Sequence, residues 1–534
     1  MSFPTRLVVL LAAILVDHAV NAQLAQASDA LPTVSFLTRP QSYAPRLNIT
    51  TSGAFAHGYI FLAPYQHPGS GPYIYDKFGN LVWDGFGVGK VVGPANSHDF
   101  KVCQYQGVPH LCLTQSNQQR GYAVGHALVI NSNYRIVAQI QTGRDARPSD
   151  QHEFQLIDGQ SPSGILTSYR TVPFDLSAFN VTTGQGWLQE GMFQEIDVAS
   201  GEVVFEWYST NHVDPSDTQI KPNTTDVGGD GLTAHTAFDY FHINSIDKSD
   251  DGNYLVSARH TSTIYYINGT DQSIIWQLSY QGKSDFTCEN FNFSFQHDAR
   301  IMSRSDTVMN ISIFDNAANC YDSTDRQSSG RFITIDTVAG TATQTRRILA
   351  PQGGIQSCSQ GNTQVLGDGS VFQGWGDKAW FSEHNADNEL VLAGTYTNTS
   401  VTETTAMNYR AFSFEWESTP NTTKPAVYSY ALNDTAANTI YVSWNGATTV
   451  TTWRFYGAQQ VGDVFEMIGN ETKTGFETTY RPPQFHPWVM VEAVAWDGTS
   501  LANSSYQPTF VPSSTLAAYC DDASCEAATT YDAM

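Results

Sequence analysis

The sequence predicts an all-β protein in which a large β-propeller is followed by a smaller β-sandwich. Apolar residues rarely recur at helical spacing, and short apolar runs alternate with turns rich in Gly, Asp and Asn. The pattern of apolar runs and turns also changes after residue 419. Each short run belongs to a small antiparallel sheet that cannot bury its faces alone, so these units must stack. Radial stacking makes a propeller, which leaves only short, protected edges.

The first 22 residues have the pattern of a secretory signal peptide. Arg6 precedes an apolar run from Leu7 to Val16, and Val20-Asn21-Ala22 forms a small-residue cleavage site. The run is shorter than the roughly 20 apolar residues needed to span a bilayer, and no later run reaches that length. We therefore expect a secreted, extracellular protein that begins near Gln23 and has no membrane span.

Two turn-and-strand patterns alternate along residues 30–418, the predicted propeller. In one, a turn glycine precedes an apolar run, as at residues 79–83, 201–207 and 269–276, and weakly at 340–343. In the other, Asp-Gly precedes the run, as at residues 251–256 and 368–372. At residues 387–392 the same pattern has Asp-Asn in place of Asp-Gly. These repeats indicate about five to seven blades between Thr33 and Glu417, at about 40–65 residues per blade.

A second domain is predicted over residues 424–512. Its expected strands cover residues 427–432, 439–444, 451–455, 464–468, 476–480 and 489–496. Trp444 and Trp453 supply large side chains for a core, as in the fibronectin type III and immunoglobulin-like sandwiches. Residues 513–534 have the composition of an acidic tail.

The formal net charge of −24 argues against nucleic acid and anionic membranes as partners. Many Asn-x-Ser/Thr sequons indicate a glycoprotein if the host glycosylates, because such sites mark surface positions. They lie at Asn48, Asn180, Asn223, Asn268, Asn292, Asn310, Asn398, Asn421, Asn433, Asn470 and Asn503. The sequence shows no signal for oligomerisation, and the oligomeric state is left open.

The cysteines also indicate an oxidising compartment, where disulfide bonds persist. Cys103 and Cys112 bracket a short turn and predict a disulfide across a hairpin, while Cys520 and Cys525 lie close together in the tail. The others are Cys288, Cys320 and Cys358. We favour a Cys288–Cys320 bond, because it would tie down both ends of the segment that contains His297.

Three histidines and one arginine stand out as candidate site residues. His152 lies in Asp-Gln-His-Glu-Phe, His242 in Phe-His-Ile-Asn-Ser and His297 in Gln-His-Asp-Ala-Arg. Arg259 lies one strand downstream of His242. A guanidinium presents a planar fork of donors that matches oxyanions, and imidazole serves as nucleophile, acid or base near neutral pH. The set therefore predicts a site that handles an anion.

Residues 239–247, followed by 253–260, resemble the arylsulfotransferase family, particularly its secreted fungal branch. Residues 150–154, 296–300 and 361–376 are similar to the same family in the same order. The resemblance covers most of the chain from about Thr33 to Thr509. It implies a six-bladed propeller with the site on its central axis. One departure is that the bacterial enzymes have an extra N-terminal domain, whereas this chain has a C-terminal sandwich.

The resemblance also implies the reaction and the roles of the site residues. The family's bacterial members transfer sulfate between phenolic compounds without a nucleotide donor, through a transiently sulfated histidine. His297 matches that nucleophile, and His242 and Arg259 match the residues that hold the sulfuryl oxygens. Asn244 matches a substrate-binding neighbour, and His152 matches a further catalytic histidine. The expected substrates are small aryl sulfates and phenols, with no cofactor and no metal.

These residue types suit the chemistry. Sulfuryl transfer, like phosphoryl transfer, passes through a loose transition state with charge on the peripheral oxygens. Catalysis then rests on positioning and electrostatic stabilisation, and one donor such as Arg259 contributes about 3–4 kcal/mol to lowering the barrier. A neutral His297 can attack if its second nitrogen is held as a donor. We expect Asp298 and Arg300 to form an ion pair that locks the loop of His297.

Two other functions remain open. A metal-dependent or quinone-dependent propeller enzyme, such as a lactonase or dehydrogenase, is possible because the three histidines with Glu153 and Asp298 offer cation ligands. The chain has no tight His-x-His cluster there, and Arg259 disfavours a cation. A non-catalytic secreted binding protein is the other option, because function resides in the site and not in the fold. Glu383 and His384 either approach the propeller axis or lie in a surface turn.

Overall fold

The computed structural model describes residues 32–66, 69–88, 96–182, 184–223, 227–351, 354–397 and 406–513. The predicted signal peptide, the tail beyond Ser513, and Cys520 and Cys525 lie outside these residues. Apart from four short 3-10 helices, the elements of the described chain are strands, and the predicted all-β class is confirmed. The helices are η1 (Ser177–Phe179), η2 (Ser209–Asn211), η3 (Pro215–Asp217) and η4 (Ala234–Thr236). No helix in the described part is long and apolar enough to cross a membrane.

Between residues 48 and 414 of the described chain, six mainly antiparallel sheets of four or five strands follow one another. The first contains β28 (Phe412–Phe414), β2 (Tyr59–Leu62), β4 (Tyr73–Tyr75) and β5 (Leu81–Asp84). The second contains β6 (Asn96–Tyr105), β7 (Val108–Gln118), β8 (Ala123–Ile130) and β9 (Ile136–Ile140). The third contains β10 (Phe154–Ile157), β11 (Ser163–Phe174), β12 (Gly186–Asp197) and β13 (Val203–Tyr208).

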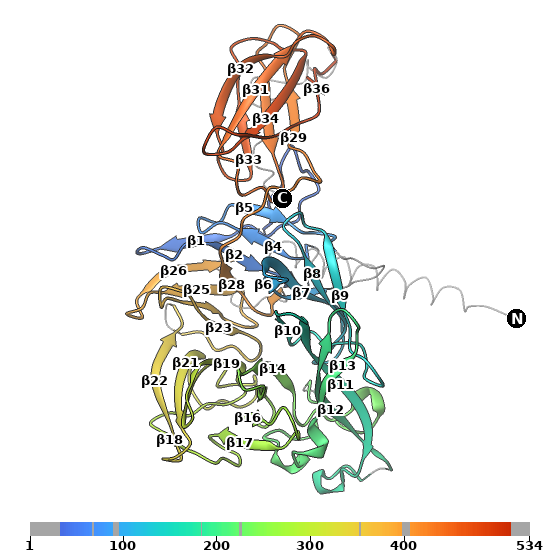
Figure 1. The fold of residues 1–534 in the computed structure, drawn as a ribbon, viewed down its shortest axis with the longest axis vertical. Coiled ribbons are helices and arrows are strands. Elements are labelled where there is room, and N and C mark those ends of the chain that lie inside the picture. The colour runs from blue at the N-terminus through green and yellow to red at the C-terminus, as the bar shows by residue number, and fades with distance from the viewer. Residues whose placement is uncertain are drawn as a thin grey trace, which may run out of the picture.

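The next three sheets continue this order. The fourth contains β14 (Ile243–Lys248), β15 (Tyr254–Ala258), β16 (Thr263–Ile267) and β17 (Ile274–Ser279). The fifth contains β19 (His297–Arg304), β20 (Val308–Asp315), β21 (Ser329–Asp336) and β22 (Thr341–Leu349), with β18 (Thr287–Glu289) added in parallel to β22. The sixth contains β23 (Asn362–Val365), β24 (Val371–Gly374), β25 (Trp380–His384), β26 (Leu390–Thr395) and β1 (Asn48–Thr51). Figure 1 shows the six sheets following one another around the lower body in chain order, from blue to orange.

The first and sixth sheets each contain a strand from the opposite end of this part of the chain. β28, from the end of the segment, pairs with β2 near its start, and β1 pairs with β26. The short strands β3 (Pro64–Tyr65) and β27 (Met407–Asn408) pair beside them. Edge strands of neighbouring sheets also touch, as β6 touches β10 and β14 touches β19. The segments that meet at these edges carry the candidate site.

Apolar clusters fill the spaces between successive sheets. β15 shows how one strand serves two of them. Successive side chains of a strand point to opposite faces, so Val256 packs against the third sheet and Leu255 against the fifth. Both are fully buried, which explains why this strand has an unbroken apolar run and not an alternating one.

Residues 426–508 form two further sheets, which stand apart at the top of Figure 1. One contains β29 (Ala426–Tyr430), β30 (Thr439–Ser443) and β33 (Glu477–Tyr480). The other contains β31 (Thr452–Ala458), β32 (Glu466–Thr472), β34 (Trp488–Val494), β35 (Ser500–Asn503) and β36 (Gln507–Pro508). Trp444 and Trp453 are buried in the apolar cluster of this part, as the sequence predicted.

Gly446 joins these two sheets to the first and second sheets. Its N–H donates to the carbonyl of Val82 at 2.9 Å, and its carbonyl accepts from the Tyr134 hydroxyl at 2.8 Å. The residue has a φ of +84°, and a Cβ here would lie 2.2 Å from the Tyr134 ring. Only glycine allows this approach.

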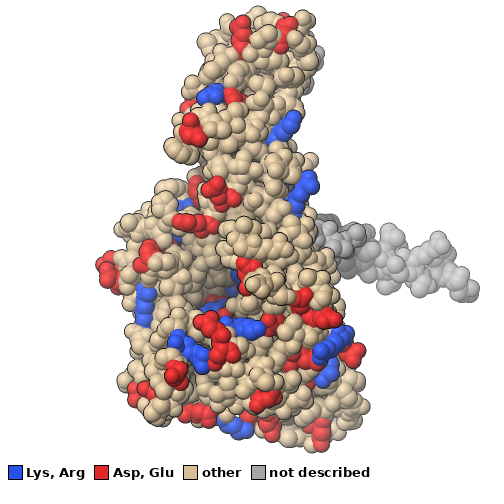
Figure 2. All heavy atoms as spheres, viewed as in Figure 1, with Lys and Arg blue, Asp and Glu red and all other residues tan. Residues whose placement is uncertain are grey.

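Figure 2 shows acidic side chains in excess of basic ones over the visible face, in line with the formal net charge of −24.

One predicted disulfide is confirmed and one is wrong. Cys103 and Cys112 are bonded across β6 and β7, with Cα atoms 5.8 Å apart. Cys320 is bonded to Cys358 and not to Cys288, which is a half-buried free thiol. Cys288 lies in β18 at the outer edge of the fifth sheet, whereas Cys320 lies in the loop after β20, on the side where the site forms.

Candidate functional site

Four of the predicted site residues line one pocket of about 390 Å³. His152 immediately precedes β10, His242 precedes β14, Arg259 follows β15 and His297 opens β19. The four side chains thus come from three sheets, at strand ends that the stacking of the sheets brings together. All four are at least 95% buried. A larger groove, of about 1010 Å³, lies beside the first sheet around Phe78 and contains none of them.

Asn244, the fifth predicted residue, does not line this pocket. It is fully buried in β14, and its side-chain amide donates to the carbonyl of Gln296 at 2.7 Å. The backbone carbonyl of Asn244 accepts a hydrogen bond from the Arg410 guanidinium at 3.0 Å. Asn244 therefore holds Gln296, the residue that precedes His297, and has no direct place in the pocket lining.

His152 is held by Asp150. Its Nδ1 and its backbone N–H both contact the Asp150 carboxylate, the latter at 3.0 Å. Burial opposes the charged form of Asp150, but His152 and the N–H of Ala123 outweigh it and lower the pKa of this carboxyl. Asp150 is therefore an ionised acceptor that orients His152 and leaves its Nε2 for the pocket.

His242 is held by Asp239 in the same way. Nδ1 of His242 lies 2.6 Å from one carboxylate oxygen of Asp239. The backbone N–H of His242 donates to the other oxygen at 2.9 Å. Burial lowers the pKa of His242 well below its usual value, and His152 and Arg259 lower it further. The rings of His152 and His242 meet edge to face with centroids 4.9 Å apart. His242 is therefore a neutral imidazole whose Nε2 is an acceptor.

Arg259 brings a permanent positive charge into the pocket. Its Nη1 lies 2.5 Å from Nε2 of His260, and its Nη2 donates to the carbonyl of Cys358 at 2.9 Å. The guanidinium also lies over the Phe295 ring, 5.7 Å from its centroid. Arg259 therefore supplies a fixed positive donor for an anion, close to His242 and His297, which burial keeps neutral.

The orientation of His297 is set by Asn316. Nδ1 of His297 lies 2.7 Å from Oδ1 of Asn316, whose amide nitrogen donates to the carbonyls of Ser357 and Gln360. Oδ1 is an acceptor, so Nδ1 of His297 carries the proton and Nε2 carries the lone pair. Burial lowers the pKa of His297 well below its usual value, with Arg259 as the next cause.

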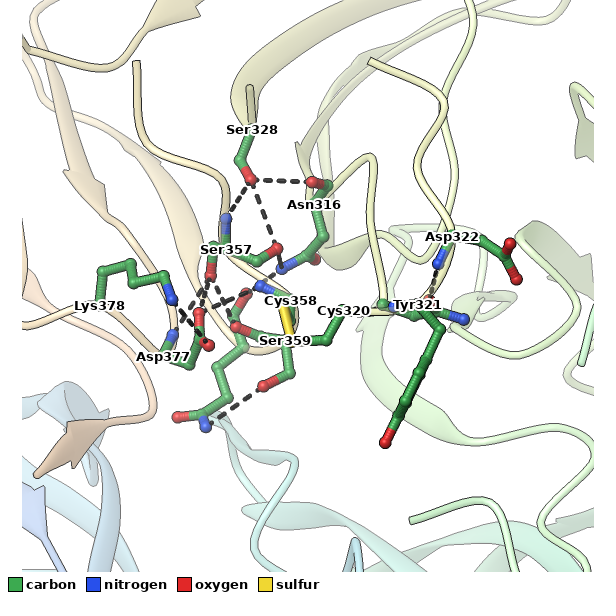
Figure 3. The surroundings of a disulfide bond; sticks show 12 residues. Asn316, Cys320, Tyr321, Asp322, Ser328, Ser357, Cys358, Ser359, Asp377 and Lys378 are labelled. Atoms are coloured by element: carbon green, nitrogen blue, oxygen red, sulfur yellow. Dashed lines mark hydrogen bonds and ion pairs between the residues drawn. A yellow bond between two sulfur atoms is a disulfide. The ribbon is translucent and has the colours of Figure 1, made fainter. Parts of the chain in front are cut away.

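The backbone N–H of Gln360 donates to Nε2 of His297 at 3.1 Å. Gln360 has a φ of +66°, a left-handed conformation that costs a non-glycine residue about 1–3 kcal/mol. The Cys320–Cys358 disulfide and Asp377, which accepts from the backbone N–H of Cys358 at 3.1 Å, hold the preceding residues (Figure 3). A constrained segment therefore places a backbone donor directly beside the predicted nucleophile.

A buried ion network includes Glu153 and Asp298, the residues that directly follow His152 and His297. Arg300 pairs with Asp298 at 2.8 Å, as predicted, and with Glu153 at 2.6 Å. Arg410, from the segment before β28, pairs with Asp99 of β6 at 2.8 Å and also contacts Glu153. Burial opposes the charge on Glu153, but Arg300 and Arg410 outweigh it and lower the pKa of its carboxyl. The network joins the first, second, third and fifth sheets at their inner edges.

Glu383 and His384 lie outside the pocket lining. Glu383 pairs with Lys77 at 2.5 Å, and His384 contacts the Ser382 hydroxyl at 3.2 Å, both within buried surroundings of the sixth sheet. They therefore neither approach the site nor lie in a surface turn.

Sequence reasoning missed the residues that orient the predicted ones. Asp150 and Asp239 precede their histidines by two and three positions, so a search for an acid just before each histidine would have found them. Asn316 and Gln360 carry no such local signal, because they reach His297 from the loops that follow β20 and precede β23.

The site also contains a set of possible metal ligands. Ligand atoms of Asp239, His242 and His260 all lie within 4.8 Å of one another. Arg259 disfavours a cation here, since its guanidinium touches His260. Both Nδ1 atoms are also engaged, that of His242 with the Asp239 carboxylate and that of His260 with the Asp239 carbonyl. The donor set fits a hydrogen-bonded group better than a metal centre.

The all-β fold thus contains a buried pocket in which three histidines and one arginine meet, residue types that suit the binding of an anion. The family model of the arylsulfotransferases (ASST) matches residues 106–398, more than half of the chain. The chain belongs to this family. Membership indicates an aryl sulfotransferase-like activity in general, and the matched range contains all five predicted site residues. No curated protein matches the chain.

Solved structures resemble the chain at low identity. A protein of unknown function from Bacteroides caccae is 11% identical, with 70% of this chain and 100% of that one covered and a TM-score of 0.36. A protein from Lactobacillus plantarum is also 11% identical, with 80% and 100% covered and a TM-score of 0.31. The GH43 protein BlXynB from Bacillus licheniformis is 8% identical, with 77% and 88% covered and a TM-score of 0.28.

Proposed function

We propose that this protein transfers a sulfuryl group from an aryl sulfate ester to a phenolic acceptor through a sulfohistidine at His297, independently of nucleotide sulfate. The observation that carries the proposal is the convergence of His152, His242, Arg259 and His297 on one buried pocket. Such a site has both a neutral nucleophile and a fixed positive charge for the sulfuryl oxygens.

In the first half-reaction, Nε2 of His297 attacks sulfur and a nitrogen–sulfur bond forms. The sulfur–oxygen bond to the aryl group breaks, and its electron pair leaves on the phenolic oxygen, which takes up a proton. Asn316 holds the Nδ1 proton of His297, so Nε2 keeps its lone pair. In the second half-reaction the oxygen of an acceptor phenol attacks sulfur, loses its proton, and releases His297.

The N–H of Gln360 must leave Nε2 of His297 before attack. The same N–H lies where it can donate to a sulfuryl oxygen once that group bonds to Nε2, and it would then act as an oxyanion donor beside Arg259. His152 suits the role of the proton carrier, since the ionised Asp150 beside it stabilises an imidazolium. His242, kept neutral by burial, suits the role of a sulfuryl-oxygen neighbour.

We further propose the architecture that the family resemblance implies. The six sheets would be blades of a six-bladed propeller over residues 30–418, closed by β28, with the pocket on its axis. Residues 424–512 would form a fibronectin type III-like sandwich. The N-terminal pattern and the two disulfide bonds support secretion, as in the fungal branch of the family.

The test is a transfer assay with a chromogenic aryl sulfate, with and without added phenol. Wild type should release the chromophore faster with phenol, and His297→Ala should lose both release and transfer. His384→Ala, a buried histidine outside the pocket, is the matched control and should keep both activities. Wild-type protein that releases nothing from a panel of aryl esters would refute the proposal and favour the binding-protein alternative.

The metal-dependent alternative rests on the Asp239, His242 and His260 group. Elemental analysis of purified protein, followed by dialysis against a chelator, separates it from sulfuryl transfer. Stoichiometric metal whose removal abolishes the activity would favour the alternative.

A further inference from the structure

We propose that His260 is a positioning residue that holds the guanidinium of Arg259 against the sulfuryl site. This inference rests on the proposed function. His260 is fully buried and does not line the pocket. Its Nε2 lies 2.5 Å from Nη1 of Arg259, so it acts on the substrate only through the arginine.

The proton on His260 follows from its two partners. Arginine has donors and no acceptor, so Nε2 of His260 must offer its lone pair to Arg259. Nδ1 then carries the proton and donates to the main-chain carbonyl of Asp239 at 2.5 Å. Burial, which lowers the pKa of His260 well below its usual value, agrees with this neutral form.

Asp239 couples two site residues through this contact. Its carbonyl fixes His260, while its carboxylate fixes His242 at 2.6 Å. The rings of His242 and His260 lie close together, with centroids 4.5 Å apart. The aspartate therefore sets the imidazole of His242 directly and the guanidinium of Arg259 through His260.

Fixing Arg259 matters because a flexible arginine would lose side-chain entropy on binding an anion. The Nη1 contact to His260 and the Nη2 contact to Cys358 bind both ends of the guanidinium before substrate arrives. A donor group held in advance stabilises developing charge more than one that must reorganise.

Two substitutions separate positioning from packing. Gln at position 260 can place an acceptor near the location of Nε2 and keep the contact to Arg259. Asn at the same position can place a donor near the location of Nδ1 and keep the bond to Asp239, but it is too short to reach Arg259. We therefore compare His260→Gln, His260→Asn and Arg259→Ala, each checked first by thermal unfolding.

The primary measurement is the affinity for inorganic sulfate by titration calorimetry, which needs no turnover. His260→Gln should bind sulfate within about threefold of wild type, whereas His260→Asn should weaken it about tenfold or more, as expected for the loss of a charge-assisted contact. In the transfer assay, His260→Asn should lower kcat more than it raises KM. If His260→Asn does not fold, His260→Gln must still bind sulfate at least about tenfold more tightly than Arg259→Ala.

Equal sulfate affinity in the Gln and Asn variants would overturn the positioning role, as would wild-type protein that binds no sulfate. Wild-type protein that binds sulfate with the expected variant pattern but transfers no sulfuryl group would support the role of His260. That result would refute only the proposed transfer function.

Discussion

Nδ1 of His297 lies 2.7 Å from Oδ1 of Asn316, and this contact decides which nitrogen of His297 faces the pocket. Asn316 comes from the loop after β20, nineteen residues beyond His297. Because Oδ1 can only accept, Nδ1 must donate and the lone pair remains on Nε2. The nucleophile of the proposed reaction is thus defined by a neighbouring amide as much as by its own imidazole.

The Asn316→Ala substitution should therefore slow transfer by about 100-fold, because a misplaced nucleophile loses most of its alignment. The amide nitrogen of Asn316 also holds the segment of Gln360, so the loss should appear mainly in kcat. Steady-state kinetics with a chromogenic aryl sulfate measure it. Asn310→Ala, whose side chain contacts exposed Ser303, is the control and should leave kcat unchanged. An Asn316→Ala enzyme with wild-type kcat would contradict the tautomer argument.

Stability should fall as the pH falls below about 6.5. Burial lowers the folded-state pKa of His242, His260 and His297 well below the ordinary value of 6.5. The free energy of unfolding therefore keeps its full value above pH 6.5 and decreases as the pH falls toward the folded-state pKa values. The reason is that the unfolded chain binds protons that the folded chain does not.

Thermal unfolding at a series of pH values between 8 and 5 measures this effect. The His260→Gln variant removes one titrating group and should show a shallower fall over the same range. An unfolding temperature that stays constant in both proteins from pH 7 to pH 5 would contradict the neutral state of the buried histidines.

Glu153→Gln should destabilise the fold by about 3–5 kcal/mol, because it removes a negative charge that both Arg300 and buried Arg410 contact. Denaturant unfolding gives the free energy. The control is Glu206→Gln, which removes the partner of the largely exposed Arg144 and should cost less than about 1 kcal/mol. Similar effects for the two substitutions would show that the network does not hold the sheets together.

Replacing both Cys320 and Cys358 with serine should reduce transfer by about tenfold or more, since the segment that contacts Arg259 and His297 loses its covalent anchor. It should also lower the free energy of unfolding by about 2–4 kcal/mol. The matched control replaces both Cys103 and Cys112 with serine. Their disulfide bond links the two strands of a hairpin away from the pocket. Equal losses of transfer in the two variants would leave the Cys320–Cys358 bond a purely structural role.

Local patterns predicted much of the fold for a physical reason. An apolar run such as residues 254–256 forms a strand in almost any stacking of sheets, and its two buried faces require neighbours on both sides. The all-β class and the buried Trp444 and Trp453 followed from such patterns. The Cys288–Cys320 bond was wrong because separation along the chain does not report which edge of a sheet a cysteine occupies.

Short sequence motifs identified the side chains that suit anion chemistry, namely His152, His242, Arg259 and His297. How these side chains work together depends on contacts that form when the chain folds. Asn316 reaches His297 across the β19–β20 hairpin, and Gln360 reaches it from the segment before the sixth sheet. His260 is the sequence neighbour of Arg259, but its imidazole is oriented by the distant Asp239. Hydrogen-bond direction depends on distances of a few ångströms across such segments, and no local pattern encodes those distances.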